Sequence, residues 1–403
     1  GGGGGGYTGG GGERLSAQGQ FYEGRDIGWP ATAGASIPRE SRRGASLDYG
    51  AQLGGGIVDA VAVRGHVQRL DHEMVVGMRM VRPDGSAVVT TTEQRSHSTV
   101  SGGRVQLRLR PVAGSHADVG VEATHWGAEA TRWQERRVPG APPAELVLRS
   151  WPAVRIVDVG AFGQGEARLS EGVVASAGAR LDRVGRRAEG WQSSAEWVFT
   201  GNAGVKARLA GAVVARAVGG WGYRIPDATE LFGLALKADG FAYQGNPELA
   251  TERNRNVEVG VGREGEHVEA SLTLFRNDLA GMIAPVLLPG DTMIGGRPVR
   301  SYENVAAARL EGVSASARWR AAGWLELSGS ATYVEGEDRV AGGPLAQVPP
   351  LSGRLAARVV AGGSSSRWLE LAWRGAARQT RVAAAIGEPE TPGYGLVDVR
   401  AGM

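Results

Sequence analysis

The feature that most constrains this chain is a one-for-one alternation of apolar and polar residues that recurs in segment after segment. In 104–110, for example, apolar residues occupy the odd positions and polar residues the even ones. The same period recurs in 205–218, 325–333 and 368–374. Successive side chains of a β-strand point to opposite faces, so each segment has one apolar and one polar face. The pattern predicts an all-β protein built from antiparallel strands.

The length of these segments indicates a barrel that spans a membrane. Tilted strands of roughly 9–11 residues cross a bilayer, whereas strands of a soluble sandwich usually have about 5–6 residues. No run approaches the roughly 18–20 continuous apolar residues of a spanning helix. Short turns such as 82–86 and 262–266 are expected at one end of the barrel. Long loops rich in Pro, Gly and charge, such as 132–151 and 231–251, are expected at the other.

Tryptophan placement agrees with a membrane barrel. Trp126, Trp151, Trp319 and Trp324, among others, fall near the ends of the expected strands. Such positions suit the aromatic girdles that lie at the two membrane interfaces. Packing of these rings in a soluble core is the alternative.

The first residues differ from the rest because they carry no alternation. Gly1–Gly6 and Gly9–Gly12 have no pattern, and we interpret residues 1–12 as a flexible segment. The chain has 65 glycines without a Gly-X-Y period, which excludes collagen, and the apolar residues at period two argue against disorder. Residues 13–403 are expected to form one β-barrel domain.

Charge and cysteine usage exclude several classes of protein. The 45 basic and 42 acidic residues give a net charge of only +3, and the arginines are spread along the alternating segments, so nucleic-acid binding is not expected. The absence of cysteine excludes disulfide scaffolds, Cys-ligated zinc and Cys nucleophiles. No nucleophile–base set and no phosphate-binding loop is recognisable, so an enzyme is not expected.

Two turn-rich phrases stand out in the middle of the chain, 223–232 and 245–254. Their prolines define turns, and the charged residues near them are most simply explained as groups that order a loop. We therefore expect a structural role, rather than ligand contact, for Arg224, Pro226, Glu230, Phe232, Gly245, Asn246, Pro247, Glu248 and Glu252.

The amino-acid sequences of these two segments resemble motifs in the barrel half of TonB-dependent outer-membrane receptors. The segment 223–232 resembles the family phrase F-R-A-P-[ST]-x-x-E-L-F. The segment 245–260 resembles G-N-P-x-L-x-P-E followed by a spaced Glu and Gly, with Thr251 where Pro is usual. Further on, 274–283 and 302–313 resemble the next strands of the family, in the same order.

The resemblance implies an importer of a scarce metal complex of the iron–siderophore, copper or cobalamin class. It also implies a 22-stranded barrel in the lipid of a Gram-negative outer membrane, energised by the TonB–ExbB–ExbD complex. Family members carry an N-terminal plug domain and a TonB-binding segment, and neither is recognisable in this sequence. The segment 392–400 resembles a strand that family members follow with two or three more. We therefore expect an incomplete barrel without its plug, and a passive porin-like barrel or a soluble β-rich adhesin or binding protein stays open as an alternative.

One stretch, 58–80, carries side chains that bind metals. Strands are expected at Val58–Leu70 and His72–Met80, and if the alternation continues between them, Val61, Val63 and Val67 face lipid. The opposite, lumen face then carries Arg64, His66, Gln68, His72, Met74, Met78 and Met80. Thioether and imidazole groups together suit copper, especially Cu(I).

A second resemblance points the same way. The segment 71–74 resembles the D-H-x-M-D-N phrase of copper receptors within the family, with Val75 and Val76 in place of Asp-Asn, and 24–30 resembles their R-D-x-G-Y-P. We therefore take His66, His72, Met74, Met78 and Met80 as candidate contacts for a metal chelate or copper as the transported ligand, and expect no resident cofactor. In the alternative interpretation the methionines fill apolar gaps and His72 belongs to a polar girdle.

Overall fold

Almost all regular structure in the computed structural model is β-strand, and it describes residues 2–28, 34–54, 56–236, 240–361, 367–384 and 388–402. The strands of the wall are β1 (Gly2–Thr8), β2 (Arg14–Gly28), β3 (Ala35–Gln52), β4 (Val58–Val81), β5 (Ala87–Leu109), β6 (Ser115–Arg137), β7 (Ala144–Ser170), β8 (Val173–Arg187), β9 (Ser194–Ala210), β10 (Val213–Arg224), β13 (Glu252–Glu264), β14 (Val268–Leu287), β16 (Arg297–Ala322), β17 (Leu325–Asp338), β18 (Ser352–Ala361), β19 (Arg367–Ala376) and β20 (Tyr394–Gly402). The remaining elements are α1 (Ala228–Phe232), β11 (Leu234–Leu236), β12 (Ala242–Gln244) and β15 (Met293–Ile294).

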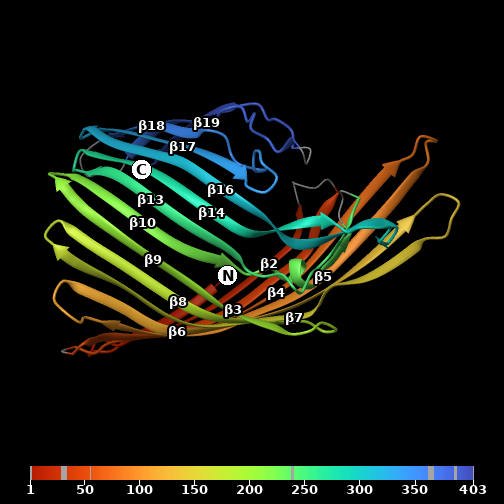
Figure 1. The fold of residues 1–403 in the computed structure, drawn as a ribbon, viewed down its shortest axis with the longest axis horizontal. Coiled ribbons are helices and arrows are strands. Elements are labelled where there is room, and N and C mark those ends of the chain that lie inside the picture. The colour runs from red at the N-terminus through yellow and green to blue at the C-terminus, as the bar shows by residue number, and fades with distance from the viewer. Residues whose placement is uncertain are drawn as a thin grey trace.

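The wall strands form one continuous curved sheet (Figure 1). Each pairs antiparallel with the next, from β1 to β10 and then through β13, β14 and β16 to β20. Within the described residues β1 pairs only with β2, and β20 only with β19. The prediction of an all-β antiparallel barrel wall is confirmed. No helix of the described chain is both long and apolar enough to cross a bilayer.

The two faces of the wall differ in chemistry. On one face the apolar positions of neighbouring strands lie side by side, as where Val105 pairs with both Val63 and Val121. These side chains are largely exposed, and we call this face the outer face. Leu274, Leu355, Leu371 and Val399 are further examples that are each more than half exposed. Such a continuous apolar surface is the kind that faces hydrocarbon in membrane barrels.

The opposite face, called the inner face, carries ladders of paired charges. Arg108 donates to Asp118 at 3.1 Å, and Arg374 pairs with Asp398 at 3.1 Å. Arg180 binds the fully buried Asp182 at 2.7 Å and Glu122 at 2.8 Å. Because these charges satisfy one another within and between strands, the inner face is polar without a large net charge.

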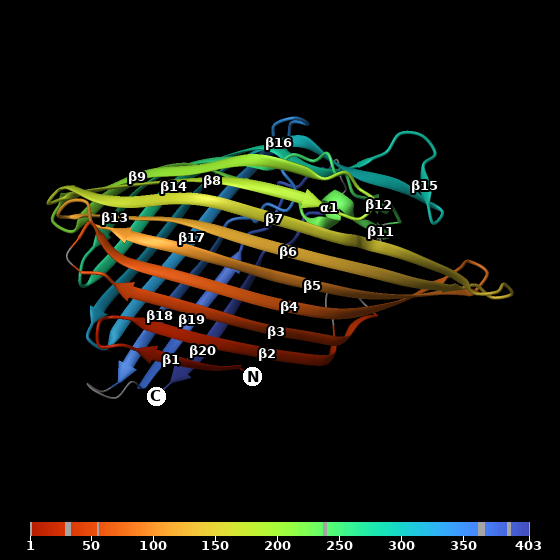
Figure 2. The same cartoon turned by 90° about the horizontal axis from the view of Figure 1, so that it is seen from below.

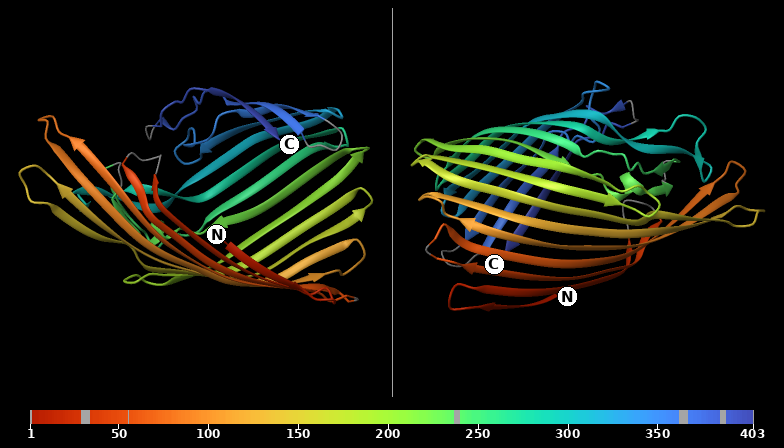
Figure 3. Two further views of the ribbon diagram at one scale, coloured as in Figure 1. Left: turned by 180° about the vertical axis from the view of Figure 1, so that it is seen from behind. Right: turned by 60° about the horizontal axis from the view of Figure 1, so that its bottom comes forward.

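Strand lengths differ from the prediction. The strand β7 has 27 residues, and β4 is one continuous strand of 24 residues where two strands were predicted. The loop predicted for 132–151 is mostly strand, because β6 runs to Arg137 and β7 begins at Ala144. The hairpins β4–β5 and β6–β7 therefore project beyond the rest of the wall (Figures 1 and 3). We call this end of the wall the mouth.

The beginning of the chain also differs from the flexible segment predicted for residues 1–12. Residues 2–8 form β1, which pairs with β2 from Gly2 opposite Gln20 to Thr8 opposite Arg14. A ladder of backbone hydrogen bonds needs no side chains, and the edge of β2 offers free N–H and C=O groups to the glycines. Composition alone did not reveal this strand because glycine carries no alternation.

Candidate functional site at the mouth

Between β10 and β13 the chain leaves the wall and folds against the inner face of β7 at the mouth (Figure 2). The helix α1 begins after Pro226 with Asp227 as its N-cap. The Asp227 carboxylate accepts hydrogen bonds from the backbone N–H groups of Thr229 at 2.7 Å and Glu230 at 2.8 Å. Glu230 accepts in return from the N–H of Asp227 at 2.8 Å. This reciprocal capping box explains why so short a helix forms at this phrase.

Arg224 ties the two ends of this excursion together. Its guanidinium donates to Glu252 at 2.6 and 2.7 Å and to Glu230 at 2.8 and 3.0 Å. Glu252 also accepts from the backbone N–H of Ile283 at 2.8 Å. Burial raises the pKa of Glu252, but the hydrogen bonds from Arg224 and Ile283 outweigh it and hold the pKa below its ordinary value. We call Arg224, Glu230 and Glu252 the arginine clamp.

The second phrase closes the excursion onto the first. The N–H of Asn246 donates to the carbonyl of Glu230 at 2.7 Å, and its side chain donates to the carbonyl of Tyr302 at 2.9 Å. The same side chain accepts from the N–H of Glu248 at 2.9 Å, across Pro247. A Cβ on Gly245 would lie 2.5 Å from the backbone nitrogen of Phe232, so only glycine fits at this crossing. Of the predicted loop-ordering residues, the structure brings all into this region, although Glu248 takes part through its backbone.

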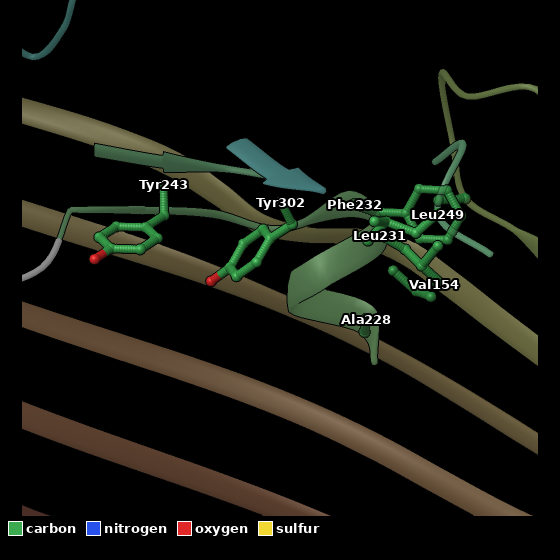
Figure 4. Packing of buried hydrophobic residues seen from close by; sticks show 8 residues of the cluster. Val154, Ala228, Leu231, Phe232, Tyr243, Leu249 and Tyr302 are labelled. Atoms are coloured by element: carbon green, nitrogen blue, oxygen red, sulfur yellow. The ribbon is translucent and has the colours of Figure 1, made fainter. Parts of the chain in front are cut away.

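Apolar side chains of the excursion pack on the inner wall beneath it (Figure 4). Leu231 is fully buried, and Phe232 and Leu249 are nearly so, against Val154 of β7. The rings of Tyr243 and Tyr302 lie 6.0 Å apart on the same surface. We call this group, with Ala188 and Ala228, the mouth cluster.

Three of the tryptophans predicted to lie in the membrane girdles, Trp126, Trp151 and Trp191, belong here instead. Trp126 and Trp151 pack against the mouth cluster with their ring centroids 6.2 Å apart. The indole nitrogen of Trp151 donates to the hydroxyl of Thr229 at 3.1 Å. Strand-end placement was the signal for a girdle, but these strands extend past the apolar band, so their tryptophans face the excursion. Trp319 and Trp324, in contrast, are each about half exposed at the far end of the wall.

Next to the mouth cluster lies a positively charged, aromatic surface that the sequence did not reveal. Arg132 donates to Gln94 at 2.8 Å and to the carbonyl of Leu236 at 2.9 Å. Burial, and after it the charge of Arg297, lowers the pKa of the Arg132 guanidinium. Arg132 and Arg297 therefore lie close enough for their charges to oppose each other.

Aromatic groups complete this surface. The Arg300 guanidinium lies 3.7 Å from the centre of the Phe241 ring and donates to the Tyr243 hydroxyl at 3.1 Å. We call Arg132, Arg297, Arg300, Phe241 and Tyr243 the mouth surface. Arg132 lies in the segment 132–151 that is predicted as a loop, and no motif marks 297–300. The sequence therefore does not predict that these arginines form a surface.

The candidate metal contacts on β4 share one face, as the alternation predicts. The pairing of β4 with β5 has no register shift from Ala60 to Val81, so His66, His72, Met74, Met78 and Met80 all lie on the inner face. They do not share one point. A strand rises about 3.4 Å per residue, which places the Cα atoms of His66 and His72 about 20 Å apart and those of Met74 and Met78 about 14 Å apart. Only the pairs His72–Met74 and Met78–Met80 are direct neighbours.

The surroundings of these residues also differ. The Nδ1 atom of His72 lies 3.1 Å from a carboxylate oxygen of Glu40, and Met74 pairs in register with Gln94. Met78 and Met80 are 43% and 65% exposed near the tip of the β4–β5 hairpin. Among the residues that the structure describes, no three His, Asp or Glu side chains gather in a metal-binding group. The phrase 24–30 lies partly outside the described residues.

Comparisons with known proteins agree on the fold. The sequence model of the family described as "TonB dependent receptor-like, beta-barrel" matches residues 1–403. No curated protein sequence matches the chain.

Several solved structures resemble the structure of this chain. The copper transporter OprC has 19% sequence identity and a TM-score of 0.74, covering 96% of this chain and 60% of that one. BauA, the ferric preacinetobactin receptor from Acinetobacter baumannii, has 13% identity and a TM-score of 0.68, covering 98% and 63%. The ferric yersiniabactin uptake receptor FyuA from Yersinia pestis has 14% identity and a TM-score of 0.63, covering 96% and 59%. At these identities the likeness shows the fold, and this chain spans less than two thirds of the length of each.

Proposed function

The chain belongs to the TonB-dependent receptor family, as its β-barrel, and on this premise we propose that it serves the import of a scarce metal complex across the outer membrane of a Gram-negative bacterium. The observation that carries the proposal is the family match over residues 1–403 on a wall with an apolar outer face and a charged inner face. In the complete protein, import is driven by the TonB–ExbB–ExbD complex. The outer face is in contact with outer-membrane lipid.

The mouth surface favours an anionic chelate as the cargo. Guanidinium groups bind carboxylate and other oxyanions through paired hydrogen bonds, and aromatic rings offer flat contacts to ring systems in a chelator. Arg132, Arg297 and Arg300 supply the positive charge, and Phe241 supplies a ring, while Tyr243 is itself buried and supports Arg300 through its hydroxyl.

Uptake by the complete receptor tests this proposal. In a strain that lacks its own receptor, we expect the Arg132→Gln/Arg300→Gln double variant to raise the KM for an iron chelate by about tenfold or more, because two charge-assisted contacts are lost. The control variant is Arg354→Gln, which breaks a charge pair with Glu370 on the inner wall. Uptake that is unchanged in the double variant would overturn the role of the mouth surface.

Energy dependence separates the importer from a passive porin. We expect uptake at nanomolar chelate to stop when the proton-motive force is collapsed or TonB is deleted. Uptake that continues at the same rate under both conditions would establish a passive pore. A soluble adhesin is tested separately, since a membrane barrel migrates differently on a gel before and after heating in detergent.

Copper is the second candidate cargo, and the neighbouring pair His72 and Met74 favours it. Imidazole and thioether groups on adjacent positions of one face are suitable ligands for Cu(I). We expect the Met74→Ala/Met78→Ala double variant of the complete receptor to abolish the copper-dependent growth of a strain that relies on this receptor. Full growth of the double variant on copper would exclude copper binding by this strand.

A further inference from the structure

The inner face carries a hollow at the far end of the wall, away from the mouth. It has a volume of about 730 Å³ and is lined by residues of β9, β10, β13, β14, β16, β17 and β18 and of the turn after β13. The short turns from β9 to β10, from β13 to β14 and from β16 to β17 lie beside it, at the end of the wall opposite α1 (Figure 2). We call it the far hollow, and none of the five residues of the mouth surface lines it.

Short hydroxyl side chains form the floor of the far hollow. Ser271, Ser316 and Ser330 follow one another across β14, β16 and β17, because each pairs in register with the next. The hydroxyl oxygens of Ser271 and Ser316 lie 2.8 Å apart. A second row of hydroxyl residues runs beside the first and consists of Thr273, Ser314 and Thr332. A hydroxyl group both donates and accepts hydrogen bonds, so this floor suits a ligand that is rich in oxygen atoms.

Positive charge predominates at the far hollow. Five basic and two acidic residues line it, and one of the basic residues, Arg263, has the parity of the outer face. Three others are paired with carboxylates: Lys206 with Glu264 at 2.7 Å, Arg318 with Glu269 at 3.2 Å and Arg354 with Glu370 at 2.5 Å. The remaining one, Arg216, has no ion pair in the part of the chain that the structure describes. On the inner side of the hollow, its charge is therefore the one without a counter-charge.

The position of Arg216 sharpens this imbalance. Arg216 lies directly opposite Lys206 in the β9–β10 register, and like charges in that position repel each other. Its guanidinium donates to the hydroxyl of Thr273 at 2.5 Å, which orients the group but does not neutralise it. Arg104, another inner-face arginine without an ion pair among the described residues, has a different environment. Its guanidinium lies 4.2 Å from the centre of the Phe162 ring, whose π-electrons attract the charge.

We propose that the far hollow is a second binding site for an anionic cargo, which reaches it after the mouth surface. Guanidinium and ammonium groups bind carboxylate oxygens through charge-assisted hydrogen bonds, and a bound carboxylate gives Arg216 the counter-charge that its position lacks. The serine hydroxyls bind further oxygen atoms of the cargo. The volume of the hollow lies within the range of roughly 300–1,000 Å³ that small-molecule sites have. The inference rests on the proposed function, because it takes its cargo from there.

The far hollow differs from the mouth surface in a way that fits a transfer site. None of its described lining residues is aromatic, so hydrogen bonds and charge hold the cargo there without ring contacts. A site along a path must bind tightly enough to accept the cargo and weakly enough to release it. A protein domain packed against this part of the wall is the competing occupant, and the experiments below distinguish the two.

Binding of radiolabelled citrate, a tricarboxylate, to the purified chain in neutral detergent tests the site. The background is the Arg132→Gln/Arg300→Gln variant, in which the mouth surface lacks two of its charges, and equilibrium dialysis gives the Kd. In this background we expect Arg216→Gln to weaken citrate binding by about tenfold, because a charge-assisted contact is lost, and Arg216→Lys to recover part of the loss. The control Arg108→Gln breaks the pair with Asp118 elsewhere on the inner wall and should leave the Kd unchanged.

Uptake by the complete receptor separates this site from the mouth surface. Arg216→Gln should lower the maximal rate of chelate uptake severalfold and leave the KM unchanged, because capture at the mouth is intact. The mouth double variant has the opposite signature, which is a raised KM. A failure of the proposed function removes both effects, whereas a failure of the far hollow alone leaves the effect on the KM in place.

Three results would overturn the proposal. The first is an equal Kd for citrate in Arg216→Gln and in its background. The second is an equal loss of affinity in Arg108→Gln, which would assign the effect to the overall charge of the inner face. The third is a lower unfolding temperature of the complete receptor with Arg216→Gln while citrate binding stays the same, which would indicate that a domain docks at the far hollow. Every variant is first shown to be folded by its heat-modifiable migration on a gel.

Discussion

The excursion between β10 and β13 and the face of β4 that carries the candidate metal contacts are built in opposite ways. In the excursion, residues far apart in sequence converge: Arg224 reaches both Glu230 and Glu252, and Leu231 is fully buried. On β4, residues close in sequence diverge along one strand, from His66 to the exposed Met80. Sharing a face of a sheet is therefore not the same as sharing a site.

This difference separates two kinds of sequence signal. A phrase that contains a proline, a helix cap and complementary charges specifies a local structure, because each group needs its partner. A row of polar residues at period two specifies only which side of the sheet they occupy. The mouth surface shows the limit of both signals, since Arg132 and Arg297 come from separate hairpins and approach each other only in the folded wall.

The largest expected effect tests the convergent region. Leu231→Ala removes buried side-chain atoms from the mouth cluster, and we expect the excursion to lose about 2–5 kcal/mol of local stability. Amide hydrogen exchange across 225–251 measures this loss. Val340→Ala, at a position that is 67% exposed, is the control and should leave exchange unchanged. Equal exchange in both variants would show that the cluster does not hold the excursion in place.

A smaller effect is expected at the arginine clamp. The Arg224 side chain is 43% exposed, so solvent weakens its ion pairs, and we expect a coupling energy of about 1 kcal/mol with Glu252. A double-mutant cycle of Arg224→Gln and Glu252→Gln, read out by the same exchange experiment, measures it. If the stability losses of the two single variants add up to that of the double variant, the two groups act independently.

The clamp should also respond to pH. Because the folded-state pKa of Glu252 lies below its ordinary value of 4.5, its contribution is complete above that value and is lost as the pH falls through the folded-state pKa. We expect the excursion to open progressively under acid conditions while the wall stays folded. In the Glu252→Gln variant, amide exchange across 225–251 should depend less on pH. An unchanged pH dependence would mean that another group causes the opening of the excursion in acid.

The smallest effect is expected on β4. Met78→Ala and Met80→Ala should each change the free energy of unfolding by less than about 0.5 kcal/mol, because both side chains are exposed to solvent. Thermal unfolding in detergent measures this. A loss comparable to that of Leu231→Ala would reveal packing at the hairpin tip and would remove the contrast between the two regions.

The sequence predicted the wall better than it predicted the site. Alternation gave the antiparallel sheet and the parity of β4, because those depend only on neighbours along one strand. It did not give strand lengths, since the long β6 and β7 continue past the apolar band into polar residues that read as loops. The family phrases located the excursion, whereas the mouth surface depends on register between hairpins, which no local pattern contains.

The glycines of β1 have one more consequence. Five consecutive positions, Gly2–Gly6, lie opposite 16–20 without a single Cβ, so nothing in that part distinguishes one alignment from another shifted by two places. Only Tyr7 and Thr8 pin the strand against Leu15 and Arg14. The alignment of the whole first strand is therefore specified from one end, by the two side chains that close its hairpin.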